Sequence, residues 1–252
     1  MNLDGQLGGP CVKKIQLSNG LRVVMESIPT SRSVSFGIWV KTGSRNETPE
    51  INGITHFIEH MMFKGTERFD ARAIAEQFDA IGGNVNAFTA KEYTCYYAKV
   101  LDEHFPIAVD VLSDMFFNSK LDAEELAKEK NVILEEIAMY EDTPDDLVHD
   151  LMSTAVYGDH PLAFPILGTK ERLEAMDSDA LRAYMEHHYT IENTVIALAG
   201  NINEGTIELL ERHFGGFSNR RAPQALEVPS FLDGVQFRKK KTEQNHICMS
   251  FP

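Results

Sequence analysis

Two histidines and a glutamate lie within the five-residue run His56-Phe57-Ile58-Glu59-His60. On an α-helix, positions i, i+3 and i+4 share one face, so these three side chains would project the same way. Two neutral imidazoles can hold a divalent metal, and a neighbouring carboxylate can take a proton from a bound water. The run therefore predicts a helix that carries a metal-dependent hydrolytic site. The alternative is an amphipathic helix with two structural histidines.

The residues around this run favour a short helix. Gly53 and Thr55 mark its start, and Gly65 marks its end. Apolar side chains recur at helical spacing around the histidine pair, at Phe57, Ile58, Met61 and Met62.

A catalytic zinc needs three protein ligands, so a third must come from elsewhere in the chain. The best source is the segment 121–150, which holds eleven acidic residues and two lysines and reads as a long amphipathic helix. Glu135 and Glu136 lie in its apolar half, where a carboxylate is costly to bury unless it is paired or binds a metal. Most of the other acids fit a solvated helix face.

Glu129 lies seven residues before Glu136, on the same face but about 10 Å away along the helix axis. At that separation both carboxylates cannot easily bind one ion. The helix geometry therefore predicts a supporting contact for Glu129.

With these residues the chain resembles the N-terminal half of a pitrilysin-family (inverzincin) zinc metallopeptidase, of the short type similar to mitochondrial processing peptidase and its bacterial relatives. In that family the H-x-x-E-H motif is followed by a distant glutamate, and Glu136 lies 76 positions after His60. The resemblance implies one Zn²⁺ ion on His56, His60 and Glu136, with Glu59 as the catalytic general base. Glu129 matches a second family glutamate.

A second block, residues 81–100, carries the resemblance independently. Gly82-Gly83 ends a helix, and two strands follow at 84–89 and 93–100. An ordinary hairpin would need no function. The resemblance implies instead that the first strand is a sheet edge on which a peptide substrate adds as one more strand. The residues in that role are Asn86, Ala87, Phe88 and Thr89.

The order of expected elements predicts an α+β fold, with an antiparallel sheet and helices packed on one side. This is the α/β sandwich of the resembled family. Residues 1–11 are expected to be a flexible extension or an expression remnant, and 12–219 a zinc-bearing catalytic domain. Residues 220–236 read as a linker. Residues 237–252 are expected to start a second, homologous domain that is truncated, with a strand at 243–252.

The resemblance implies a zinc-dependent endopeptidase that hydrolyses peptides or presequence-like segments. Family enzymes close two such halves around the substrate, and the second half supplies an arginine and a tyrosine, so the truncated chain alone is expected to cleave slowly or not at all. One alternative is a non-catalytic partner or core subunit that binds peptides without cleaving them. Such members have usually lost motif residues that are present here. Another alternative, a structural zinc module, would need four protein ligands.

Composition restricts the partners. The net charge of −14 argues against a nucleic-acid partner, because a basic surface is missing. Acidic walls would attract basic peptides, but solubility explains the charge equally well. The resemblance adds a homologous second domain or subunit, giving a dimer. Three cysteines favour a reducing compartment. The absence of a signal peptide or a long apolar run predicts a cytoplasmic protein of bacterial type with no membrane contact.

Overall fold

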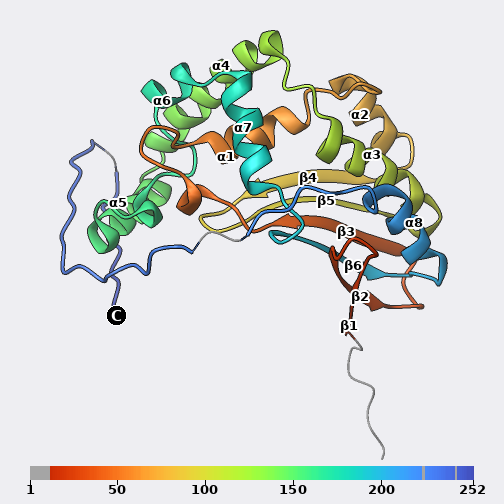
Figure 1. The fold of residues 1–252 in the computed structure, drawn as a ribbon. Coiled ribbons are helices and arrows are strands. Elements are labelled where there is room, and N and C mark those ends of the chain that lie inside the picture. Colours follow the sequence, from red (N-terminus) through yellow and green to blue (C-terminus); the bar gives the residue numbers. More distant parts are fainter. Residues whose placement is uncertain (1–11, 223–224, 242) are drawn as a thin grey trace, which may run out of the picture.

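A six-stranded sheet lies beneath a layer of helices in the computed structural model, which describes residues 12–222, 225–241 and 243–252 (Figure 1). The strand order is β1-β2-β6-β3-β5-β4, so β4 is an edge strand. The strands are β1 (Val12–Gln16), β2 (Arg22–Ser27), β3 (Ser33–Val40), β4 (Asn84–Thr89), β5 (Thr94–Leu101) and β6 (Thr194–Gly200). The predicted extension 1–11 lies outside the described residues.

Four of the five strand pairings are antiparallel, and β2 with β6 is parallel. A parallel pair requires a long crossover, which here runs from β2 through all the intervening elements to β6. The predicted α+β class is confirmed. The parallel pair was not predicted, because the residue pattern of a strand does not show which strand it pairs with.

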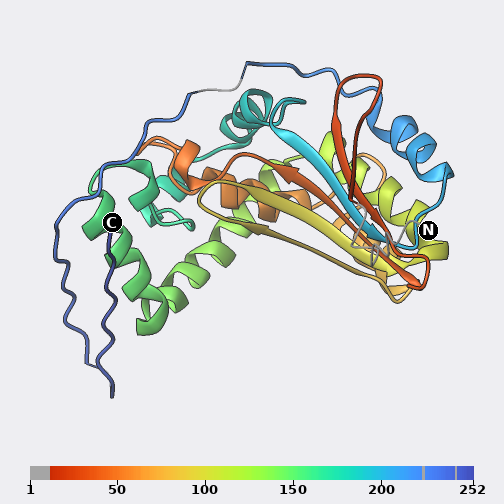
Figure 2. The same cartoon turned by 90° about the horizontal axis from the view of Figure 1, so that it is seen from below.

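The helices cover one face of the sheet and leave the other face open (Figures 1 and 2). In chain order they are α1 (Ile54–Met62), α2 (Ala71–Asp79), α3 (Phe105–Asn118), α4 (Ala123–Glu141), α5 (Pro144–Tyr157), α6 (Lys170–Ala175), α7 (Ser178–His188) and α8 (Gly205–Phe214). Short 3-10 turns occur at η1 (Ser44–Asn46), η2 (Asp102–His104) and η3 (Pro161–Ala163). Strands and helices do not alternate strictly along the chain, in agreement with the order of elements expected from the sequence.

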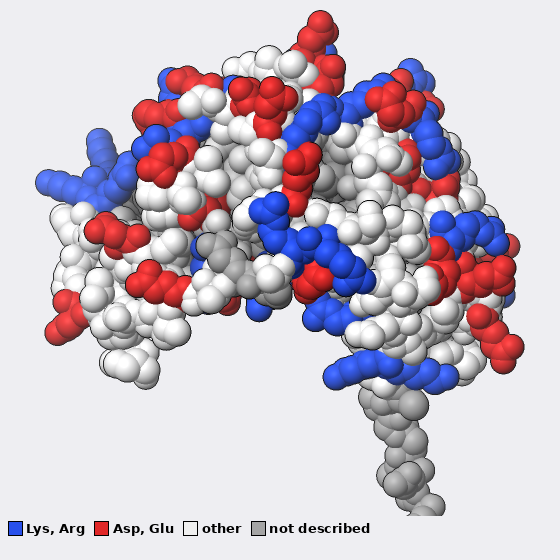
Figure 3. All heavy atoms as spheres, in the orientation of Figure 1, with Lys and Arg blue, Asp and Glu red and all other residues white. Residues whose placement is uncertain are grey.

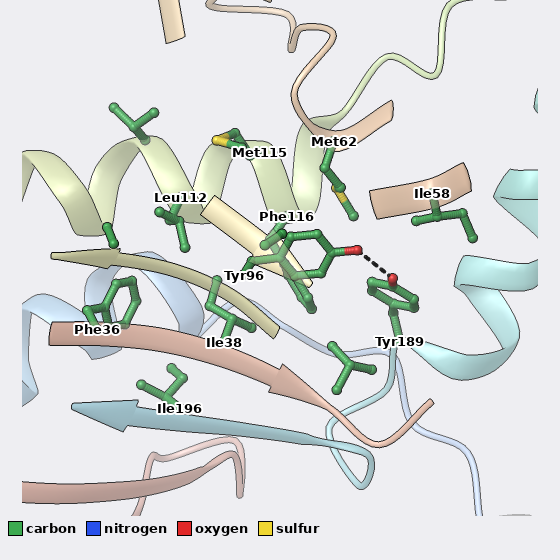
Figure 4. Packing of buried hydrophobic residues seen from close by; sticks show 14 of the residues in the cluster. Phe36, Ile38, Ile58, Met62, Tyr96, Leu112, Met115, Phe116, Tyr189 and Ile196 are labelled. Atoms are coloured by element: carbon green, nitrogen blue, oxygen red, sulfur yellow. Dashed lines mark hydrogen bonds between the residues drawn. The ribbon is translucent and has the colours of Figure 1, made fainter. Parts of the chain in front are cut away.

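The core lies between the sheet and the helices (Figure 4). Alternate residues of β3 point into it, because a strand presents every second side chain to the same face. The buried hydroxyls of Tyr96 and Tyr189 are 2.8 Å apart and satisfy one another inside this apolar layer. The packed side chains seen there include Phe36, Ile38, Ile58, Met62, Leu112, Met115, Phe116 and Ile196.

The C-terminal segments 225–241 and 243–252 contain no helix or strand, so the strand predicted at 243–252 is not formed. A strand needs a hydrogen-bonded neighbour, and these segments lie beside α5, which is a helix (Figures 1 and 2). The Leu232 N–H donates to the Val156 carbonyl at 2.8 Å. Among the described residues, no helix combines the length and apolar character needed to cross a membrane.

Candidate active site

The helix α1 is held in place by the core. Seven of its nine residues are buried, including the apolar Ile54, Phe57 and Met61. His56 and His60 follow one another by one turn, and their ring centroids are 4.5 Å apart. The predicted helix is therefore present, and it brings the two imidazoles together.

Glu136 of α4 reaches this histidine pair. Its Oε2 atom lies 3.5 Å from His60 Nε2 and 3.8 Å from His56 Nε2. One ligand atom from each of the three residues can be chosen so that all lie within 4.8 Å of one another. Tetrahedral ligands at about 2.1 Å from one zinc ion are roughly 3.4 Å apart. The donor set of two nitrogens and one oxygen, at these separations, fits a catalytic zinc.

The protonation of the three groups differs. Burial, together with the nearby charge of His60, lowers the pKa of His56 to about 4, so His56 is neutral at pH 7, as a metal ligand must be. Burial also acts to lower the pKa of His60, but hydrogen bonds to Glu136 and Glu129 outweigh it and raise that pKa. The hydrogen bond with His60 lowers the pKa of Glu136. His56 Nδ1 has no hydrogen-bond partner among the described residues.

Glu129 contacts the other nitrogen of the His60 ring. Its Oε1 atom lies 2.8 Å from His60 Nδ1, and its Oε2 atom forms an ion pair with Lys64 Nζ at 2.6 Å. The Glu129 side chain is buried, whereas that of Glu136 is 36% exposed. A carboxylate on Nδ1 fixes the orientation and tautomer of the imidazole and leaves Nε2 free to face a metal.

Glu59 lies beside the ligand group and faces β4. Its Oε2 atom accepts a hydrogen bond from Thr89 Oγ1 at 2.5 Å, and burial raises the pKa of its carboxyl. A cavity of about 300 Å³ connects the ligand group with the sheet edge. Its lining includes His56, Glu59 and Glu136 together with Ala87, Phe88 and Thr89.

Of the four residues predicted to bind substrate, Asn86 alone is not part of that lining. Its side chain instead lies along the edge, where Asn86 Oδ1 accepts a hydrogen bond from the Ala87 N–H at 2.8 Å. The other three residues of this set surround the cavity.

Glu47, a residue that was not predicted to have a role, holds the start of α1 in place. This carboxylate is 3% exposed, and it accepts hydrogen bonds from the Gly53 N–H at 2.8 Å and from the Thr55 N–H at 2.9 Å. The Thr55 hydroxyl is in turn 2.9 Å from the hydroxyl of Tyr184 on α7. Nothing local in the sequence marks this role, because Glu47 lies six residues before the N-cap Gly53 and so outside the usual cap positions.

A loop also packs directly on the start of α1. Gly53, with a φ of 96°, has no side chain, and a Cβ there would lie 2.8 Å from the Leu167 carbonyl oxygen. Gly168 meets the same place from the other side, where a Cβ would lie 2.5 Å from the Asn52 carbonyl oxygen. This contact brings the loop against the helix that carries the histidines, and Leu167 is part of the cavity lining.

Two family models match the chain. The family model described as "Insulinase (Peptidase family M16)" matches residues 22–170, and that described as "Peptidase M16 inactive domain" matches 175–252. The second match begins before β6 and so includes a strand of the same sheet, because β6 pairs with β2 and β3. All the predicted metal ligands fall within the first match.

Two relatives are similar along nearly the whole chain. An uncharacterized zinc protease of Bacillus subtilis, YmxG, is 57% identical over 240 residues, which are 95% of this chain and 59% of the relative. An uncharacterized zinc protease of Streptomyces coelicolor is 41% identical over 259 residues, covering 99% of this chain and 56% of the relative. The chain thus spans just over half the length of these relatives.

Solved structures share the fold. A protease from Helicobacter pylori has a TM-score of 0.79 at 23% identity, covering 88% of this chain and 54% of that one. The peptidase M16 inactive domain from Pseudomonas fluorescens has a TM-score of 0.81 at 19% identity, covering 87% and 54%. The predicted resemblance is confirmed, and the chain belongs to the insulinase family of peptidases, peptidase family M16.

Proposed function

We propose that the protein is a zinc-dependent endopeptidase that hydrolyses a peptide bound as an extra strand on β4. One observation carries this proposal: two of the three ligand residues, His56 and Glu136, line the same cavity as Glu59 and the edge strand. A peptide bond lying along β4 would therefore meet both the metal site and a carboxylate able to accept a proton.

The backbone of β4 supports the binding mode. The Ala87 N–H points away from β5, toward the free edge of the sheet, because it donates to the Asn86 side chain. Backbone groups alternate in direction along a strand, so Val85, Ala87 and Thr89 offer N–H and C=O groups to an incoming strand. An added peptide carbonyl would take the place that Asn86 Oδ1 now occupies.

The residues present define the chemistry. His56, His60 and Glu136 would hold the ion, which when bound supplies a Lewis acid and lowers the pKa of water. Glu59 accepts the proton of the attacking water and returns it to the leaving amine. Its raised pKa suits both steps, because the carboxyl must be deprotonated first and protonated afterwards. Glu129 keeps the His60 ring in orientation.

The substrate is a peptide, with a preference for basic side chains. The chain carries a net charge of −14, although acidic and basic side chains are interspersed over the face seen in Figure 3. Glu59 and Asp150 both line the cavity, and Asp150 pairs with Lys91 at 3.6 Å, so Glu59 contributes the negative charge where the peptide would lie. The working enzyme includes a homologous second domain or subunit, because the chain covers only 59% of its Bacillus subtilis relative.

The substitution Glu59→Gln tests the proposal. It keeps the size of the side chain and removes the proton acceptor, so the variant should retain zinc while hydrolysis falls by roughly 100- to 10,000-fold. Zinc content and cleavage of a quenched fluorogenic peptide are measured on parent and variant, each together with the second domain or subunit of the working enzyme, with Glu135→Gln, an exposed neighbour of Glu136, as the control.

Equal cleavage rates in the parent and in Glu59→Gln would remove Glu59 as the base. A parent that, with its second domain or subunit present, holds zinc and binds peptide but never cleaves would favour the non-catalytic subunit. The presence and proximity of every motif residue argue against that alternative.

A further inference from the structure

Three aromatic side chains form an exposed cluster on the open face of the sheet, the face away from the helices. The rings of Trp39, Phe88 and Tyr93 contact one another, with centroid distances of 5.7 to 6.1 Å. Their exposed fractions are 36%, 38% and 43%. Three mutually packed aromatic residues that all stay this exposed form an apolar patch of the kind that marks interaction sites.

This aromatic cluster continues from the proposed substrate edge. Strand register aligns Trp39 with Cys95 and Cys95 with Phe88, so a single row crosses β3, β5 and β4. Phe88 lines the cavity beside the metal ligands, and it also lines a second hollow of about 440 Å³ on the open face. The two recesses therefore meet at Phe88, on opposite sides of the strand edge.

The backbone leaves room for the indole. A Cβ atom at Gly37 would lie 3.0 Å from Trp39 Nε1 and 3.5 Å from Cys95 Sγ. The absence of a side chain at Gly37 thus lets the ring settle over the sheet next to Phe88. Among the residues that line the hollow, Glu26 on β2 is the sole charged one, and it lies several strands away from β4.

Successive side chains of an added strand point to opposite faces of the sheet. If one peptide residue faces the helices and Glu59, each adjacent residue faces the open side, next to Phe88. We propose that the cluster of Trp39, Phe88 and Tyr93 is a binding site for a large apolar side chain of the bound peptide, at positions that alternate with those facing the metal. This inference rests on the proposed function, because it requires a peptide strand on β4.

Peptide binding without cleavage tests the inference. The zinc-loaded Glu59→Gln protein is titrated with labelled peptides of one sequence in which a single Leu is moved stepwise through Ala positions. Fluorescence anisotropy gives each affinity. We expect affinity to rise and fall with a period of two residues, by about tenfold, which is the size of partial burial of a Leu side chain. Trp39 is the only tryptophan among the 252 residues, so its emission should shift to the blue with the tight-binding peptides.

Variants separate this cluster from the rest of the open face. Adding Trp39→Ala or Tyr93→Ala should abolish the preference for Leu, while Trp39→Phe should keep most of it. The matched control is Leu101→Ala, because Leu101 is 42% exposed on the same face at the far end of β5, roughly 20 Å away. It should leave the preference unchanged. Thermal unfolding followed by circular dichroism verifies that each variant is folded.

Two results would overturn the inference while leaving the proposed function in place. One is peptide binding with no dependence on the Leu position and no effect of Trp39→Ala. The other is a preference for Lys over Leu at the same positions, which would make the cluster a cation-binding surface. Failure of every peptide to bind would overturn both the inference and the strand-addition mode. Peptide hydrolysis by the parent then reports separately on the enzyme itself.

Discussion

The two helices that supply the proposed metal ligands are built differently. In α1, seven of nine residues are buried, and the helix start is tied down by Glu47. In α4, three of nineteen residues are buried, and the Glu136 side chain is 36% exposed. The histidine pair is therefore fixed by the core, whereas Glu136 is brought to it by a helix with few buried residues. One of those buried residues is Glu129, which is bonded to His60.

The largest loss of stability is expected from a buried residue of α1, compared with an exposed residue of α4. Phe57→Ala in α1 removes a fully buried ring and should lower the free energy of unfolding by about 3–5 kcal/mol. Val132→Ala in α4 changes a side chain that is 51% exposed, and should stay within about 0.5 kcal/mol. Urea unfolding of both variants measures the contrast, and similar losses would show that α4 is as firmly anchored as α1.

The next largest effect is expected from low pH, which should destabilise the fold through His188 on α7. His188 on α7 stacks on Tyr184, with ring centroids 4.2 Å apart, and burial lowers its pKa to about 4. The unfolded chain binds that proton near pH 6.5, so stability falls as the pH drops from about 6.5 to 4, by up to roughly 3 kcal/mol. His188→Phe cannot be protonated and should flatten this part of the profile. A variant with the parent's pH dependence would exclude His188 as the cause.

A somewhat smaller loss is expected at the start of α1. Glu47→Gln leaves one amide oxygen where two carboxylate oxygens accepted hydrogen bonds, so one buried donor loses its partner, at about 1–3 kcal/mol. Thermal unfolding measures the cost against Glu50→Gln, an exposed residue of the same loop. If the two substitutions cost the same, the helix start does not depend on Glu47.

The smallest effect is expected from Glu129→Ala, which removes a contact between α4 and α1. Loss of the carboxylate frees the His60 ring and should weaken zinc binding by about 10- to 100-fold, as for other residues that support a metal ligand. Competition with a fluorescent chelator measures the affinity. Glu135→Ala, exposed on the same helix, is the control. An unchanged affinity in Glu129→Ala would mean that packing alone orients His60.

Local signals in the sequence located most elements. Helical spacing indicated a long acidic helix in the segment 121–150, which the structure divides before Pro144 into α4 and α5, and Gly82-Gly83 separated α2 from β4. The meeting of Glu136 with the histidines was reached through a family resemblance, because nothing local in the sequence joins α1 to α4. The parallel pairing of β2 with β6 was missed for the same reason, since strand pairing is a long-range property.

Contacts formed by folding explain the remaining omissions. Glu47 stands in the polar run GSRNETPE, which reads as an exposed loop, and its burial becomes evident only when the backbone N–H groups of α1 close over it. The aromatic cluster draws on β3, β4 and the turn after β4, so no single stretch of sequence contains it. The strand expected at 243–252 had suitable residues but no neighbouring strand.

The glycine contact at the start of α1 has a consequence for how this protein can change over generations. Gly53 and Gly168 each occupy the space that a side chain on the other would need, with approaches of 2.8 Å between a Cβ at one position and the Cα of the other. A side chain at either position would also meet a backbone carbonyl oxygen, that of Leu167 or that of Asn52, so replacing both glycines together gives no relief. Each position therefore stays closed to larger residues unless the loop moves off the helix that carries the histidines.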